Sequence, residues 1–264
     1  MKANQYITDF YDKHDEDGRL LSGHGKIEFF TTMRYISKYI KEGDRVLEIG
    51  AATGRYSHAL ARQRFQVDAI ELLERNIQIF REKTLPDENI TITQGNALDL
   101  SAISDNQYDI TLLFGPLYHL YSDEDKRQAL REAIRVTKVG GIVFAAYVIS
   151  DSCIIGEGFC RNKFKISELI QKGMIDPKTY ATKSEPKDVI ELVRKEEIDR
   201  LMSAFSTKRL HYVATDGISE ILQETIDTMD EDAFDAYLKY HFATCEREDM
   251  VGLTSHSLDI FQKV

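Results

Sequence analysis

Val46-Leu47-Glu48-Ile49-Gly50-Ala51-Ala52-Thr53-Gly54-Arg55-Tyr56 is the stretch that decides the fold. An apolar run leads into a turn of small residues, and the turn leads into a helical stretch. Small residues in such a turn leave the backbone open to close contact with a ligand. In open α/β sheets, ligands bind beyond the carboxyl ends of the strands, near the point where the strand order reverses. The stretch therefore predicts a strand, a ligand-binding turn and a helix, in that order.

Strand-like and helical stretches alternate on both sides of this segment. Alternation with short connections favours right-handed crossovers and a mostly parallel, doubly wound sheet that is covered on both faces. The predicted strands are 45–51, 66–72, 90–94, 108–114, 142–148, 208–214 and 257–262. The predicted helices are 26–40, 55–64, 74–83, 123–137, 219–229 and 232–244. Ser122 is expected to cap the helix over 123–137, and Gly140-Gly141 to end it.

The alternation stops after residue 150, and this divides the chain into three predicted parts. Residues 1–150 are expected to hold an N-terminal helical lid and the first five strands. Residues 151–206 are mostly helical in pattern, and we expect them to form a cap over the carboxyl edge of the sheet. Residues 207–264 are expected to complete the sheet.

Composition and charge disfavour several classes of protein. The chain has 264 residues, with 34 Lys and Arg against 44 Asp and Glu, so its formal net charge is −10. Affinity for nucleic acid depends on clustered Lys and Arg, which makes such a partner unlikely. The apolar runs are far shorter than the ~20 residues of a membrane-spanning helix, and the N-terminus lacks the apolar stretch of a signal peptide. Three cysteines without a CxxC spacing predict no metal site, and reduced thiols fit a cytoplasmic protein.

The turn differs from two familiar phosphate-binding motifs. A dinucleotide fingerprint reads G-x-G-x-x-G, whereas the turn from Gly50 to Gly54 reads G-A-A-T-G and lacks the middle glycine. No Gly-Lys-Ser/Thr follows it, which excludes a P-loop. Glu48 lies just before the turn, where a carboxylate would repel a pyrophosphate but suit a cationic, amine-bearing ligand. These features argue against an NAD-dependent oxidoreductase.

The same turn resembles the first motif of the class I S-adenosylmethionine-dependent methyltransferases, which reads roughly E/D-x-G-x-G-x-G. Glu48, Gly50 and Gly54 match it, and Ala52 replaces the middle glycine. An alanine is tolerable there if its φ is negative. The resemblance covers roughly residues 26–150 and the closing strands, and it implies a Rossmann-like, seven-stranded sheet.

Two further segments carry the resemblance. Val67-Asp68-Ala69-Ile70-Glu71 ends a strand with an acid, and in the family this acid accepts hydrogen bonds from the ribose hydroxyls. Gln94-Gly95-Asn96-Ala97-Leu98-Asp99-Leu100 resembles the adenine-binding segment, with Asn96 in place of the usual acid and Ala97 against the ring. The resemblance implies these cofactor contacts: Glu48, Ile49, Gly50, Ala51, Ala52, Gly54, Tyr56, Glu71, Leu72, Asn96, Ala97, Phe114 and Gly115.

Phe114-Gly115-Pro116-Leu117-Tyr118-His119 follows the fourth strand and resembles methyltransferases of the ubiquinone and menaquinone biosynthesis type. It lacks the Asn/Asp-Pro-Pro-Tyr signature of enzymes that methylate adenine or glutamine nitrogens. His119 is the candidate general base, because an imidazole titrates near neutral pH, and Tyr118 could orient the acceptor. A packing role for His119 and a cofactor-wall role for Tyr118 remain open.

The N-terminal arm supplies the other candidate contacts with the acceptor. Residues 1–22 are polar but contain several aromatic side chains, so we expect the arm to close over the cofactor. The predicted substrate-binding residues are Tyr11, His24, Tyr118 and His119.

The leading interpretation is a methyltransferase that uses S-adenosylmethionine, releases S-adenosylhomocysteine and methylates a small molecule. RNA or protein methylation is one alternative, and a catalytically silent S-adenosylmethionine-binding protein is another. The sequence leaves open whether the acceptor atom is O, N, S or C, and whether the protein is a monomer or a homodimer.

Overall fold

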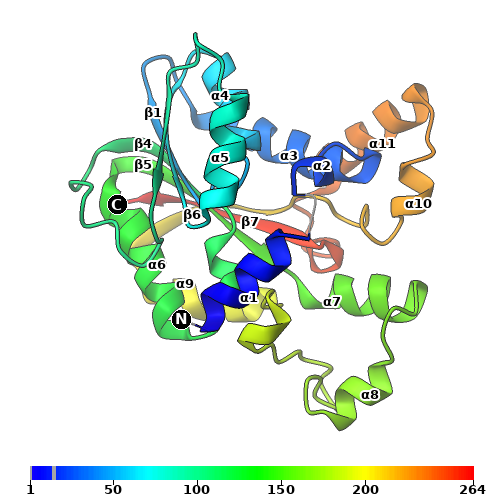
Figure 1. The fold of residues 1–264 in the computed structure, drawn as a ribbon. Coiled ribbons are helices and arrows are strands. Elements are labelled where there is room, and N and C mark those ends of the chain that lie inside the picture. The colour runs from blue at the N-terminus through cyan, green and yellow to red at the C-terminus, as the bar shows by residue number, and fades with distance from the viewer. Residues whose placement is uncertain (1, 14–15) are drawn as a thin grey trace.

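The computed structural model describes residues 2–13 and 16–264, so His14 and Asp15 of the predicted arm lie outside the described residues. Its centre is a seven-stranded sheet in the order β3-β2-β1-β4-β5-β7-β6 (Figure 1). Pairing is parallel from β3 to β5, and β7 runs antiparallel to both β5 and β6. The strands are β1 (Arg45–Ile49), β2 (Gln66–Glu71), β3 (Ile90–Gln94), β4 (Tyr108–Leu113), β5 (Thr137–Val148), β6 (Thr207–Ala214) and β7 (His256–Lys263). The predicted mostly parallel, Rossmann-like sheet is confirmed.

Helices cover both faces of this sheet, and Ser122 caps α6 as expected, accepting from the Asp125 backbone N–H. The α-helices are α1 (Lys2–Tyr11), α2 (Glu16–Arg19), α3 (Gly23–Tyr39), α4 (Arg55–Arg62), α5 (Glu74–Lys83), α6 (Asp123–Val136), α7 (Ser150–Cys153), α8 (Ile166–Gln171), α9 (Lys195–Met202), α10 (Gln223–Ile226) and α11 (Glu231–Thr244). A π-helix, Ile154–Cys160, continues α7, and short 3₁₀ turns occupy Pro116–His119, Pro186–Asp188 and Val251–Leu253. None of the helices within the described part of the chain is long and apolar enough to cross a membrane.

The core consists of two main clusters, one on each face of the sheet. Successive strand residues point to opposite faces, so Val46 joins one cluster and Leu47 the other. Helices α6 and α9 pack on the face of Leu47, while α3 and α4 pack on the face of Val46. Burial on both faces explains why the central strands β1 and β4 are largely apolar in the sequence.

The predicted end of α6 at Gly140-Gly141 is wrong. The helix ends at Val136, and β5 begins at the next residue, Thr137. The backbone N–H and the hydroxyl of Thr137 both donate to the Ala133 carbonyl, the hydroxyl at 2.6 Å, so the helix ends there without a glycine. Gly140 lies inside β5 with a φ of +81°, beside a shift in the register between β4 and β5.

The C-terminal half contains less helix than the sequence predicts. Of the predicted helix over 219–229, only α10 forms. Within 151–206, α9 packs into the core below the sheet, because Ile198, Leu201 and Met202 are buried there. The segment before α9 holds only short helices and turns. The boundaries of the cap remain a prediction.

Candidate functional site

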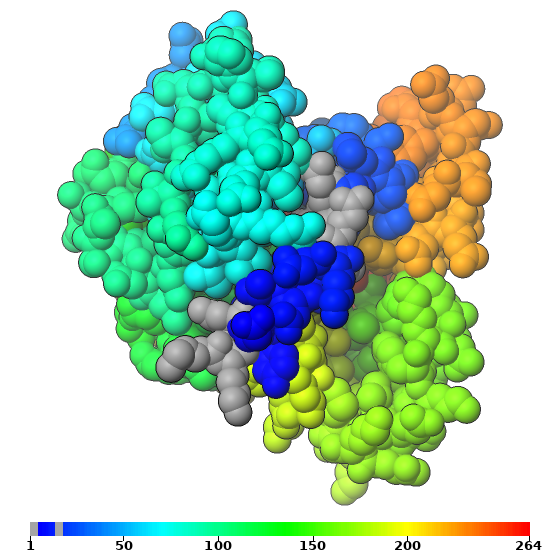
Figure 2. Space-filling model, viewed as in Figure 1, coloured from blue at the N-terminus to red at the C-terminus, as the bar shows by residue number. Residues whose placement is uncertain are grey.

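A cavity of about 510 Å³ lies at the carboxyl ends of β1, β2 and β4, where the strand order reverses. This volume is within the usual range of small-molecule sites, about 300–1,000 Å³. Helix α1 lies over the cavity and contributes Ile7 and Tyr11 to its wall. In Figure 2, α1 is the dark blue ridge that crosses the front of the molecule.

Most of the predicted cofactor residues line this cavity. They are Glu48, Gly50, Ala51, Ala52, Tyr56, Glu71, Leu72, Asn96, Ala97, Phe114 and Gly115. Two predicted contacts are not part of the wall. Ile49 is buried in the core on one face of the sheet, and Gly54 packs at the start of α4 against Phe80 and His58.

The turn after β1 is held in an unusual backbone conformation. Gly50, Ala52 and Gly54 have φ values of +80°, +47° and +89°. The condition under which an alanine is tolerable here, a negative φ, is therefore not met. A left-handed conformation costs an alanine roughly 1–2 kcal/mol, and the Ala52 N–H is fixed there by donation to Glu71 Oε2 at 2.9 Å.

Glu71 links this turn to the end of β2. Its Oε1 accepts from the Leu73 N–H at 2.9 Å and from the Asn76 amide at 3.3 Å. Burial raises the pKa of Glu71, although the backbone N–H groups of Leu73 and Ala52 oppose this rise. A carboxylate has about four acceptor positions, so these three bonds leave about one position, on Oε2, for a ligand's hydroxyl group.

Asn96 has an equally defined orientation. Its Oδ1 accepts from the Leu98 N–H at 3.0 Å, which leaves a second lone pair on that oxygen for a ligand's amine. Ala97 is buried beside it and lines the cavity.

Glu48 differs from the ionised group that the sequence suggests. Its side chain is buried and accepts a hydrogen bond from the Ser57 hydroxyl. Burial raises the pKa of Glu48 to about 8, against the opposing effect of Ser57. A pKa near 8 favours the protonated carboxyl group at neutral pH, and a cation placed beside it would favour the charged form.

His119 and Tyr11 meet across the cavity. The Tyr11 hydroxyl lies 3.0 Å from His119 Nε2, and His119 Nδ1 lies 2.7 Å from the Val189 carbonyl oxygen. A carbonyl can only accept, so Nδ1 carries the proton in the neutral ring and Nε2 presents its lone pair. The Tyr118 ring packs edge-on against His119, with centroids 4.9 Å apart.

His24, the remaining predicted substrate contact, is not among the residues that line the cavity. Its Nδ1 lies 2.8 Å from both carboxylate oxygens of Asp227, so the ring ties α3 to the segment after α10. The structure instead brings Arg19, Glu28 and His256 to the cavity wall. Sequence reasoning missed these three residues because they come from distant segments and match no local motif.

Comparison with known proteins agrees with the fold and the motifs. Residues 46–141 match the family model of a methyltransferase domain. Together with the fold, this match identifies residues 46–141 as a methyltransferase domain similar to those of the class I S-adenosylmethionine-dependent methyltransferases. S-adenosylmethionine is the cofactor of such methyltransferases, and residues of all three segments that are predicted to bind it line the cavity.

Two curated relatives show how far the similarity extends. A glycine/sarcosine N-methyltransferase of Aphanothece halophytica is 28% identical over 160 residues, which cover 59% of this chain and 58% of that protein. A demethylmenaquinone methyltransferase of Staphylococcus aureus is 32% identical over 108 residues, covering 39% of this chain and 43% of that protein. The matches thus span about half the length of these relatives.

The structural likeness extends over nearly the whole chain. The CcbJ methyltransferase of Streptomyces caelestis superimposes with a TM-score of 0.59 over 98% of this chain and 96% of that protein, at 14% identity. At this identity the likeness establishes the fold alone.

Proposed function

We propose that this protein transfers the methyl group of S-adenosylmethionine to a small-molecule acceptor. The observation that carries the proposal is a single cavity that joins two chemically distinct ends. Glu71 and Asn96 mark the cofactor end, and the cavity continues past β4 to Tyr118, His119 and His256. Helix α1 lies over it, which favours a small acceptor over a macromolecule. Monomeric or homodimeric state and a cytoplasmic location remain predictions.

The first experiment tests the cofactor. S-adenosylhomocysteine at about 100 times its dissociation constant should stabilise the protein by about 2.7 kcal/mol in thermal unfolding, whereas NAD should have no effect. Glu71→Gln should weaken S-adenosylhomocysteine about 10- to 100-fold, since a neutral amide replaces a charged hydrogen-bond acceptor. Glu74→Gln is the matched control, because Glu74 is exposed at the start of α5 and lies outside the cavity wall.

The acceptor class needs a second measurement. Labelled S-adenosylmethionine should transfer its methyl group to the metabolite fraction of a cell extract, and not to its RNA or protein. Label in RNA or protein would support the alternative acceptors. Cofactor binding without any transfer would support a catalytically silent protein.

We also propose that His119 is the general base when the acceptor carries a proton at its nucleophilic atom. Bound S-adenosylmethionine would supply the methyl group by displacement at its carbon–sulfur bond, which would leave a neutral thioether. His119 Nε2 then takes the acceptor's proton, and the Val189 carbonyl fixes the required tautomer.

His119→Ala should lower kcat at least about 100-fold while changing the affinity for S-adenosylhomocysteine little. Once an acceptor has been identified, the ratio of the wild-type kcat to the variant kcat should be measured from pH 6 to 9. Full turnover of the variant across that range would exclude the base role. Glu74→Gln, which changes an exposed side chain outside the cavity wall, is the control that should retain turnover.

A further inference from the structure

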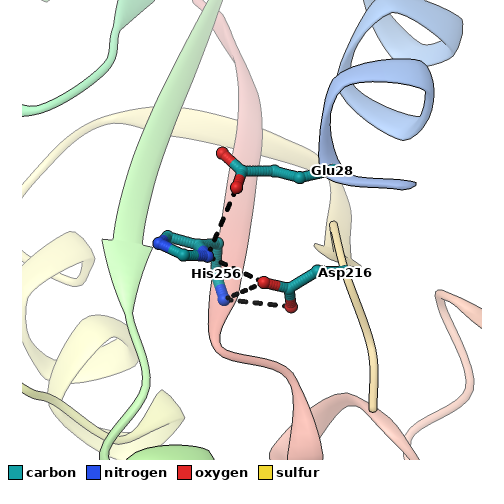
Figure 3. Close-up of side chains that lie close together, drawn as sticks. All are labelled: Glu28, Asp216 and His256. Atoms are coloured by element: carbon teal, nitrogen blue, oxygen red, sulfur yellow. Dashed lines mark hydrogen bonds and ion pairs between the residues drawn. The ribbon is translucent and has the colours of Figure 1, made fainter. Parts of the chain in front are cut away.

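A charged cluster lies at one end of the cavity, outside the cofactor-binding segments. Glu28 comes from α3, Asp216 follows β6, and His256 is the first residue of β7. Figure 3 shows the three side chains pointing toward one another. Their closest ligand atoms all lie within 4.8 Å of one another. Glu28 and His256 line the cavity, as does Arg19 beside them.

One edge of the His256 ring is fixed by carboxylates. Nδ1 lies 2.7 Å from Asp216 Oδ2 and 3.4 Å from Glu28 Oε2. Asp216 is itself immobilised, because its Oδ1 accepts from the Thr254 hydroxyl at 2.5 Å and from the Ser255 N–H at 2.8 Å. Carboxylates only accept, so Nδ1 carries a proton and the orientation of the ring is determined.

The other edge of the ring faces away from the carboxylates. Nε2 lies on that edge (Figure 3), and no hydrogen bond joins it to another of the described residues. The side chain is 21% exposed and lines the cavity. Nε2 is therefore the atom of this cluster that is available to a ligand.

The cluster gives His256 a positive charge. Burial alone would lower the pKa of His256, but the charges of Glu28 and Asp216 and the hydrogen bond to Asp216 raise it to about 9. Burial alone would raise the pKa of Asp216, but His256 lowers it. Glu220 also faces the cluster, and burial followed by the charge of Asp216 raises its pKa. At neutral pH both ring nitrogens of His256 thus carry protons.

The same contacts argue against a metal ion in this cluster. Arg19 Nη1 lies 2.6 Å from Glu28 Oε2, the oxygen that also approaches His256. A metal bound by these three residues would have to displace the His256 proton and lie next to the Arg19 guanidinium. Two cations already balance the carboxylates of Glu28 and Asp216.

We propose that His256 recognises the methyl acceptor: its Nε2–H, oriented by Asp216 and Glu28, donates a hydrogen bond to an anionic oxygen of that acceptor. The inference rests on the proposed function, because it places the cofactor at the Glu71 end and the acceptor at the His256 end. Arg19 lies on the same wall but is paired with Glu28, so the hydrogen bond from His256 carries the recognition. An acceptor with a carboxylate or another anionic oxygen fits this end best.

Benzoate and benzamide test the inference, since they differ in charge and hardly in shape. Each is titrated into protein saturated with S-adenosylhomocysteine. Benzoate should bind about tenfold more tightly than benzamide, and His256→Gln should abolish the preference. His211→Gln is the matched control: His211 has the same 21% exposure and a carboxylate partner, Glu246, but lies outside the cavity wall. It should leave the preference intact.

Three results would overturn the inference. They are equal binding of the two probes to the wild-type protein, a preference that survives in His256→Gln, and a loss of about tenfold in S-adenosylhomocysteine affinity in that variant. The last would assign His256 to the cofactor's own carboxylate.

If His256→Gln fails to fold, the Nε2 nuclear magnetic resonance signal of His256 in the wild-type protein decides: it must shift with benzoate and not with benzamide. Failure of the proposed function would appear separately, because the wild-type protein would then not bind S-adenosylhomocysteine. In that case, benzoate and benzamide would be titrated into the protein without S-adenosylhomocysteine.

Discussion

Gly54→Ala is expected to destabilise the protein by about 2–5 kcal/mol. Gly54 has a φ of +89°, which costs an alanine roughly 1–2 kcal/mol. An added Cβ would also lie 2.5 Å from Phe80 Cδ2 and 2.7 Å from His58 Cδ2. Phe80 is fully buried, and His58 Nδ1 lies 2.9 Å from Glu88, so neither ring can move freely. Such overpacking adds about 1–3 kcal/mol. Urea unfolding of the variant and the wild type measures the combined loss of stability from backbone strain and overpacking.

Gly43→Ala separates the two contributions. Gly43 has a nearly identical φ of +87°, but no atom lies within 4 Å of its added Cβ. This control should therefore lose only the roughly 1–2 kcal/mol of backbone strain. Equal losses in the two variants would show that the contact with Phe80 and His58 does not matter. A larger loss at Gly54 would establish that close packing of α4 and α5 requires glycine there.

The sequence predicts the central strands well because β1, β2 and β4 are largely buried on both faces. Five of the strands begin within one residue of their predicted starts, and β3 has the predicted bounds. The exception is β5, which begins five residues earlier than predicted. Its first part, from Thr137 to Gly141, is polar and glycine-containing and is partly exposed, so it lacks the apolar run that marks a buried strand.

The residues of the candidate site also differ in how well the sequence predicts them. Glu71 and Asn96 follow individual strands, and a local motif is enough to find them. The cluster at the other end needs Glu28 and His256, which are 228 residues apart and meet only because β7 inserts beside β5. The local sequence around His24 predicts a substrate contact, but the side chain, on α3, points toward Asp227. Contacts between distant segments leave no periodic or compositional signal.

Glu48→Gln is expected to make the stability of the empty protein less dependent on pH. Burial raises the pKa of Glu48 from 4.5 to about 8 in the folded protein. The folded state thus holds this proton more tightly than the unfolded state does. The stabilisation is complete below pH 4.5 and is lost as the pH rises through 8. At ~1.4 kcal/mol for each pH unit, the loss reaches at most about 5 kcal/mol.

Glutamine cannot ionise, yet its amide oxygen can still accept from the Ser57 hydroxyl. The free energy of unfolding of the variant, relative to that of the wild type, should therefore rise from pH 5 to pH 8.5 by up to about 5 kcal/mol. Urea unfolding of both proteins at the two pH values measures this difference. His256 and Glu71 titrate in both proteins and largely cancel in this difference. Glu74→Gln, with its exposed side chain, should show no such gain. A difference between wild type and Glu48→Gln that does not change with pH would mean that Glu48 is ionised throughout. The carboxylate of Glu48 would then be charged before the cofactor binds. Its ionisation would not depend on the cationic end of the cofactor.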